Sequence, residues 1–111
     1  MIEFGSIVLA RFPFTDLSGA KMRPALVVSK DNARRTDIVL AFITSVVPHM
    51  THRDALTIRP TALNGLKVES TVRFDKLVTL EKRIVMGKIG EADETFLKVA
   101  APVFFGVFGF G

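Results

Sequence analysis

Three polar points interrupt otherwise apolar segments of this 111-residue chain, and each could carry chemistry. They are Arg23, the pair Thr44 and Ser45, and the pair Arg73 and Asp75. An arginine grips a phosphate through two parallel N–H donors. Two arginines and a hydroxyl group are therefore suited to cleaving RNA through its own 2′-OH. That reaction needs in-line positioning, charge stabilisation and proton transfer, but no protein nucleophile.

The neighbouring residues determine how these side chains are held. Pro24 fixes its own φ angle and pushes Arg23 toward an extended conformation at the start of an apolar run. That run, residues 25–28, is typical of a strand that is covered on both faces. Arg73 and Asp75 lie two residues apart, so a strand would place both on one face.

Each of these residues also has a simpler interpretation. Arg23 could be a salt-bridge partner at the surface. Thr44 and Ser45 could do no more than end a strand, as hydroxyl residues often do. Arg73 and Asp75 could form a surface ion pair that contributes little to stability.

No cofactor is expected from the sequence. His49 and His52 lie three residues apart, but no third ligand is near them in the sequence, so we expect no metal site. The chain has no cysteine, no glycine-rich phosphate loop and no nucleophile elbow.

Composition predicts one domain in a soluble, cytoplasmic protein. Apolar residues make up 49% of the chain, no secretion signal is visible, and no apolar stretch is long enough to cross a membrane. The net charge is +4, and residues 1–90 hold 14 basic and 8 acidic side chains. This balance suits a polyanionic partner such as a nucleic acid. Tryptophan and tyrosine are absent, so stacking on bases would fall to Phe, His or Arg.

The hydrophobic pattern predicts a mainly β fold, a small and strongly curved barrel with a C-terminal helix. Pro102 should kink or end that helix, and acidic residues at its start suit a helix N-terminus. We expect the barrel over about residues 1–90 and the helix over about 91–105, in a single domain of residues 1–111. The strands are predicted at 5–14, 23–29, 36–45, 55–60, around 70–74 and at 83–90. The apolar stripe of the helix comprises Phe96, Ala100, Val103, Phe104 and Val107.

Three separated segments together resemble the MazF/PemK-like toxins of type II toxin–antitoxin systems. They are "GSIVLARFPFTDLSGAKMRPALVVS", "FITS" and "VRFDKLVTLEKRIVMGKIG", which span most of residues 5–90 in the family's order. The resemblance implies an SH3-like barrel that forms a homodimer and acts as a metal-independent, sequence-selective endoribonuclease. Its substrate would be single-stranded RNA, often mRNA, with a 2′,3′-cyclic phosphate as product. A cognate antitoxin with a disordered C-terminal tail would block the site.

The resemblance also implies roles for individual residues. Arg23 matches the family's active-site arginine, and Thr44 matches the hydroxyl residue that contacts the same phosphate. Arg73 and Asp75 match the arginine and aspartate that PemK-type members use as acid and base. We expect further RNA contacts from Lys21, Phe14, Ser45, His49 and Lys76.

The chain departs from the family pattern in three places. Ser6 replaces the usual acidic residue after Gly5, which should alter a structural contact near the start of the chain. The loop over residues 14–22 is short, so the RNA selectivity should differ. The Phe- and Gly-rich C-terminus is not part of the pattern, and it either packs into the core or covers a partner's surface.

Two other function classes remain open from the sequence. The gyrase inhibitor CcdB shares this fold and acts by binding a protein, through its C-terminal residues. A barrel that binds RNA without cutting it would have the same charge pattern. The three residues Arg23, Thr44 and Arg73 favour cleavage, because a gyrase binder would not need them.

Overall fold

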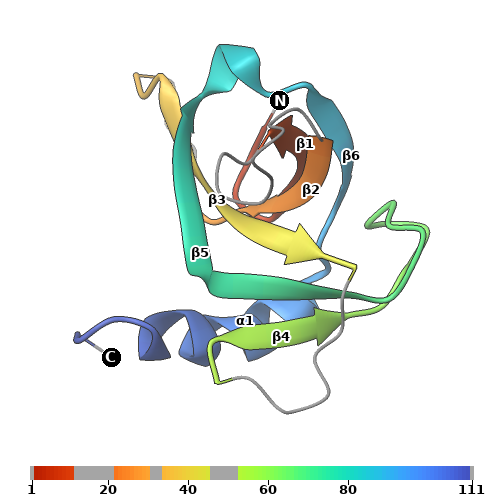
Figure 1. Ribbon diagram of the computed structural model, residues 1–111, viewed down its shortest axis with the longest axis vertical. Coiled ribbons are helices and arrows are strands. Elements are labelled where there is room, and N and C mark those ends of the chain that lie inside the picture. The colour runs from red at the N-terminus through yellow and green to blue at the C-terminus, as the bar shows by residue number, and fades with distance from the viewer. Residues whose placement is uncertain (1, 12–21, 31–33, 46–52, 111) are drawn as a thin grey trace.

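The computed structural model describes residues 2–11, 22–30, 34–45 and 53–110. In these ranges, six antiparallel strands form one sheet in the order β4-β5-β3-β2-β1-β6, and a single α-helix follows. Figure 1 shows that the sheet curls on itself and that the helix lies beneath one end of it. The expected mainly β barrel with a C-terminal helix is confirmed. The elements are β1 (Ser6–Arg11), β2 (Met22–Val27), β3 (Asp37–Thr44), β4 (Ala55–Ile58), β5 (Ser70–Glu81), a 3₁₀ turn (Lys82–Ile84), β6 (Gly87–Glu91) and α1 (Glu94–Gly106).

The longest strand, β5, bends sharply and so pairs with β3 along two stretches (Figure 1). Leu77 lies opposite Ala41, but the next residue of β3, Phe42, lies opposite Arg73. Residues 74–76 are therefore the excess residues of a bulge, which bends a strand and re-aims its side chains. The sequence predicted a strand only around residues 70–74, because the bulge interrupts the alternation of polar and apolar residues.

The central strands are buried on both faces, as the unbroken apolar run after Pro24 predicts. Neighbouring residues of β2 and of β3 belong to two different cores. The helix-side core comprises Ile7, Leu26, Ala41, Ile43, Ile58, Leu66, Val72, Phe74, Ala92 and Ala100. The strand-side core comprises Val8, Ala10, Ala25, Val27, Ile38, Leu40 and Phe42.

The helix begins at Glu94, later than the predicted start at about residue 91, because Asp93 caps it. The side chain of Asp93 accepts a hydrogen bond of 2.7 Å from the backbone N–H of Phe96, which satisfies one of the free donors at the N-terminus. The predicted apolar stripe is confirmed, since its five residues all pack on the helix-side core. Pro102 does not end the helix, which continues to Gly106. In the part of the chain that the structure describes, no helix is both long and apolar enough to span a membrane.

The strand expected at residues 83–90 begins later than predicted. Residues 82–84 form a 3₁₀ turn, and β6 starts at Gly87. Ser6, where the family has an acidic residue, is buried, and its Oγ accepts a hydrogen bond of 3.0 Å from the backbone N–H of Glu3. This hydrogen bond holds the turn over residues 3–6 that leads into β1.

The turn between β4 and β5 is locked by a buried asparagine. Asn64 Oδ1 accepts from the backbone N–H groups of Thr61 and Leu66, and Nδ2 donates to the carbonyl of Arg59. Gly65 follows with a φ of 70°. A Cβ atom on Gly65 would collide with the carbonyl oxygen of Ile89 in β6, so the turn and β6 touch through their backbones.

Replacing the glycine of this turn should destabilise the fold. We expect Gly65→Ala to lower the free energy of unfolding by about 2–4 kcal/mol, because a left-handed φ and a backbone collision add together. Gly87→Ala is the matched control, since a Cβ there meets nothing within 4 Å. Denaturant unfolding of both variants measures the difference, and equal midpoints would contradict this account of the turn.

Candidate functional site

Arg23 and Thr44 lie on the sheet face that carries the strand-side core, near the ends of their strands. Arg23 lies opposite Ala10 of β1, and the ladder between β2 and β3 sets Ala25 opposite Phe42. Residues two apart in a strand share a face. Arg23 therefore shares the face of Ala25, and Thr44 shares the face of Phe42.

Strand β5 adds its residues to the same face. Arg73 lies opposite Phe42, and Thr71 lies opposite Thr44. Residues directly opposite each other in an antiparallel pair point to the same side. We call this surface, formed by Arg23, Thr44, Thr71, Arg73 and Asp75, the site face. It brings together the four residues that the sequence singled out as catalytic candidates.

Arg73 and Asp75 form a two-pronged ion pair. Arg73 Nε and Nη2 donate to the two carboxylate oxygens of Asp75 at 2.9 and 2.7 Å. Their side chains are only 24% and 26% exposed, so this pair is more shielded than an ordinary surface pair. The hydrogen bond with Asp75 raises the pKa of Arg73, burial opposes that shift, and the charges of Asp75 and Asp54 add to it. Arg73 is thus held as a cation.

The pair leaves part of the guanidinium for a ligand. A guanidinium has five N–H donors, and Asp75 takes two of those of Arg73. The remaining donors can contact an anionic oxygen while Asp75 keeps the group oriented.

Two polar atoms of the site face are buried without a hydrogen-bond partner. Within the described residues these are Arg23 Nε and Thr71 Oγ1. A buried donor or acceptor left unpaired costs about 1–3 kcal/mol. Such groups recur where a site is prepared for a ligand. Thr71 was not among the candidates predicted from the sequence, although its alternation with Arg73 and Asp75 places it on their face.

The other predicted RNA contacts have different outcomes. Lys76 lies beside the site face, with Nζ 5.9 Å from the centroid of the Phe42 ring. Ser45 is exposed just after β3, and by alternation it points away from the face of Thr44. Lys21, Phe14, His49 and His52 lie outside the described residues. Within the described ranges, no three His, Asp or Glu side chains gather as metal ligands.

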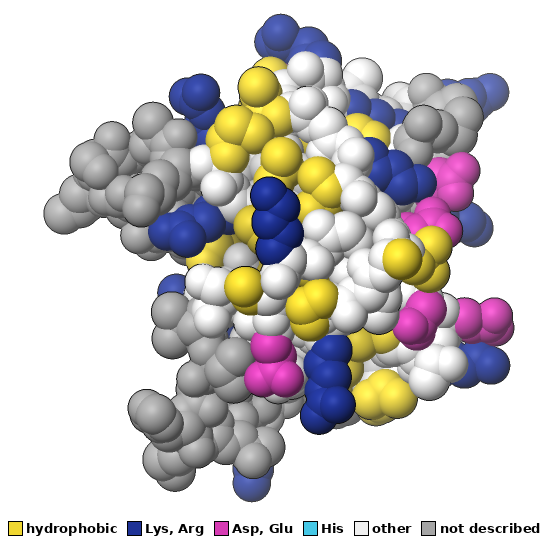
Figure 2. Space-filling view, turned by 90° about the vertical axis from the view of Figure 1, so that its right-hand side faces the viewer, with side chains coloured by type: hydrophobic (Ala, Val, Ile, Leu, Met, Phe, Trp, Pro, Cys, Tyr) yellow, Lys and Arg dark blue, Asp and Glu magenta, His cyan; other side chains and the backbone are white. Residues whose placement is uncertain are grey.

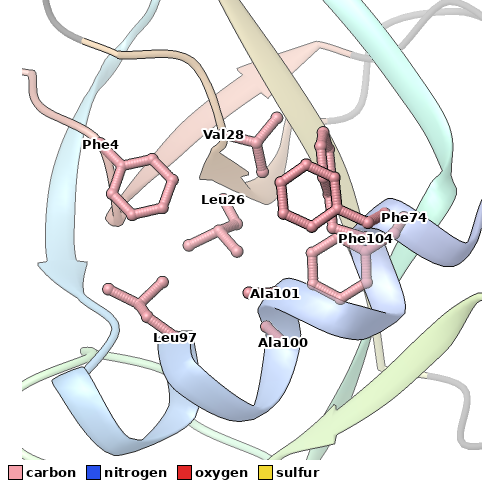
Figure 3. Close-up of a pocket in the computed structure, with 9 residues that line it drawn as sticks. Phe4, Leu26, Val28, Phe74, Leu97, Ala100, Ala101 and Phe104 are labelled. Atoms are coloured by element: carbon pink, nitrogen blue, oxygen red, sulfur yellow. The ribbon is translucent and has the colours of Figure 1, made fainter. Parts of the chain in front are cut away.

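A small cavity between α1 and the sheet is lined by apolar side chains and holds no group that could take part in catalysis. Its volume is about 180 Å³, and Figure 3 shows apolar side chains from the sheet, the helix and the N-terminal segment around it. Phe74 and Phe104 meet there edge to face, with ring centroids 6.2 Å apart. The aromatic end of the helix continues outward, where Phe105 and Phe110 are exposed. The Phe- and Gly-rich end therefore packs on the core in part, through Phe104 and Val107, whereas Phe110 does not.

The fold defines a class of small proteins built on a curled β barrel with a C-terminal helix. Residues 3–101 match the family model of the PemK-like, MazF-like toxins of type II toxin–antitoxin systems. The chain belongs to this family. No curated protein sequence matches the chain significantly.

Solved structures of similar proteins share the whole fold. An endoribonuclease in complex with its cognate antitoxin, from a mycobacterial species, matches 100% of this chain and 98% of its own, with a TM-score of 0.76 and 22% identity. The Mycobacterium tuberculosis toxin MazF-mt6 matches 96% of this chain and 98% of its own, with the same score and identity. A MazE–MazF structure from Deinococcus radiodurans matches 99% and 98%, with a TM-score of 0.75 and 23% identity.

Proposed function

We propose that this toxin is a sequence-selective endoribonuclease that cuts single-stranded RNA, including mRNA in the cytoplasm, without a metal ion. The observation that carries the proposal is the site face itself. Two arginines, a threonine hydroxyl and an aspartate from three strands share one face, and Arg23 Nε is buried there without a partner among the described residues. Family membership and the endoribonucleases among the structural neighbours support the same reading.

The proposed reaction uses the 2′-OH of the RNA as the nucleophile. The 2′ oxygen forms a bond to phosphorus and the bond to the 5′ oxygen breaks, which gives a 2′,3′-cyclic phosphate. Arg23 and Arg73 stabilise the charge on the phosphoryl oxygens, and Thr44 contacts the same group. Asp75 accepts the proton of the 2′-OH, and the 5′ oxygen leaves with a proton taken from the site or from water.

Two protein partners belong to the proposal. One is a cognate antitoxin, which the complexes among the neighbours support. The other is a second copy of the chain, because Phe4, Val99, Phe105 and Phe110 leave more apolar surface exposed around α1 than a small domain needs.

The decisive experiment is incubation of the purified protein with a long single-stranded RNA in EDTA, followed by mapping of the cut ends. We expect discrete cuts at one short sequence and 2′,3′-cyclic phosphate ends. RNA that binds the protein but stays intact would indicate a barrel that binds RNA without cutting it. Intact RNA without binding would favour a toxin of the gyrase-inhibitor kind, acting through its exposed aromatic C-terminal end.

A further inference from the structure

Thr71 places a buried hydroxyl group in the middle of the site face. The residue is only 1% exposed, yet Thr71 Oγ1 has no hydrogen-bond partner within the ranges that the structure describes. A buried hydroxyl is normally paired, because water no longer reaches it. An unpaired hydroxyl beside a proposed catalytic group therefore points to a partner that is formed when a ligand is bound.

Thr71 lies in a row of threonines that crosses three strands. Its Cα partner in β3 is Thr44, and its Cα partner in β4 is Thr57. Thr57 is exposed, so water can satisfy its hydroxyl, whereas Thr44 is half-buried on the same face as Arg23. Thr44 is therefore the neighbour through which Thr71 can act on a phosphate.

The two threonines are close enough to form a hydrogen bond. Residues directly opposite each other in antiparallel strands have Cβ atoms about 4.5–5.5 Å apart, and threonines paired in this way form side-chain hydrogen bonds. Rotation about χ1 therefore suffices to bring Thr71 Oγ1 to Thr44 Oγ1. A threonine hydroxyl has one donor and two acceptor lone pairs, so Thr44 can donate to a phosphoryl oxygen while it accepts from Thr71.

The charged surface attracts RNA but does not supply this alignment. Figure 2 shows Lys and Arg side chains spread over one face of the molecule rather than gathered at one point. Dispersed charges raise the local concentration of a polyanion without fixing one phosphate in place. A hydroxyl that accepts a hydrogen bond from a fixed neighbour has fewer directions in which it can donate, so the buried row is better suited to orienting one phosphoryl oxygen.

We infer that Thr71 is a positioning residue of the proposed ribonuclease: its hydroxyl donates to Thr44 Oγ1 and so directs the Thr44 hydroxyl at the phosphoryl oxygen. The inference rests on the proposed function. It accounts for a buried polar atom that weakens the strand while no ligand is bound, because the missing hydrogen bond forms with the substrate in place. The effect belongs to the chemical step, since the phosphoryl oxygen gains charge in the transition state.

The test removes the hydroxyl of Thr71 and keeps the shape of its side chain. Thr71→Val is expected to lower kcat about ten-fold with little change in KM, as the loss of one hydrogen bond predicts. Thr71→Ser, which keeps the hydroxyl, should retain most of the wild-type rate. Thr79→Val is the matched control, because Thr79 belongs to the same strand but is exposed and lies opposite Val39. Thermal unfolding should show Thr71→Val to be at least as stable as the wild type, since valine leaves no polar atom unpaired.

A double-mutant cycle with Thr44→Val separates positioning from a merely structural role. Because Thr71 acts through Thr44, Thr71→Val should cause no further loss of kcat in the Thr44→Val background. The same loss in that background, a wild-type rate in Thr71→Val, or no rescue by serine would overturn the inference and leave the ribonuclease proposal intact. A wild-type protein that cuts no RNA would overturn both.

Discussion

Arg23→Ala is expected to lower the rate of RNA cleavage by about 10³-fold and to leave the fold intact. An arginine that stabilises the charge of a phosphoryl transition state accounts for rate factors of about this size. Stability should not fall, because the substitution removes a buried Nε that has no hydrogen-bond partner among the described residues. Arg23→Lys should rescue little activity, since an ammonium group cannot replace the two-pronged contact.

The control for this prediction is Arg35→Ala. Arg35 is exposed and precedes β3, whereas Thr44 ends that strand, so Arg35 lies at the opposite end of β3 from the site face. Single-turnover cleavage of a mapped RNA substrate measures both variants. An Arg23→Ala protein that cuts at the wild-type rate would remove Arg23 from the site.

Asp75→Asn is expected to lower kcat by about 10²–10⁴-fold, the usual contribution of a general base. The amide cannot accept the proton of the 2′-OH, and it holds the Arg73 guanidinium less firmly than the carboxylate does. KM should change less than kcat.

Strand β5 offers a matched control for this substitution. Glu81 forms an ion pair with Arg83, two residues on, but the two side chains are 51% and 78% exposed. Glu81→Gln removes the same charge from the same strand, so kcat should stay near that of the wild type. If Asp75→Asn keeps kcat within a few-fold of the wild-type value, as Glu81→Gln should, Asp75 is not the base.

Most of the fold could be predicted from the sequence, because the patterns that indicate strands and helices involve residues close together in the chain. Pro24 and the apolar run after it predicted a strand covered on both faces, and β2 lies between two cores. The helix stripe around Ala100 was equally readable, since a period of 3.6 depends only on residues close in the chain. Pro102 was expected to kink or end the helix, but α1 continues past it to Gly106, because packing on the helix-side core outweighs the loss of one backbone hydrogen bond.

The site was harder to predict, because it depends on pairing between distant strands. Alternation alone placed Arg73 and Asp75 together, and their two hydrogen bonds bear this out. The placement of Arg73 on the same sheet face as Thr44 and Arg23 rests on the bulge at Phe42, which shifts the register of β3 against β5. No local pattern encodes that shift, and for the same reason Thr71 was overlooked.

The backbone contact between Gly65 and Ile89 also indicates which positions of this connection tolerate substitution. Main-chain atoms hold the connection in place, so the side chains of Lys67 and Val68, which are both exposed, have little part in folding. A library that varies these two positions while keeping both neighbouring turn residues, Asn64 and Gly65, should therefore lose few stable members.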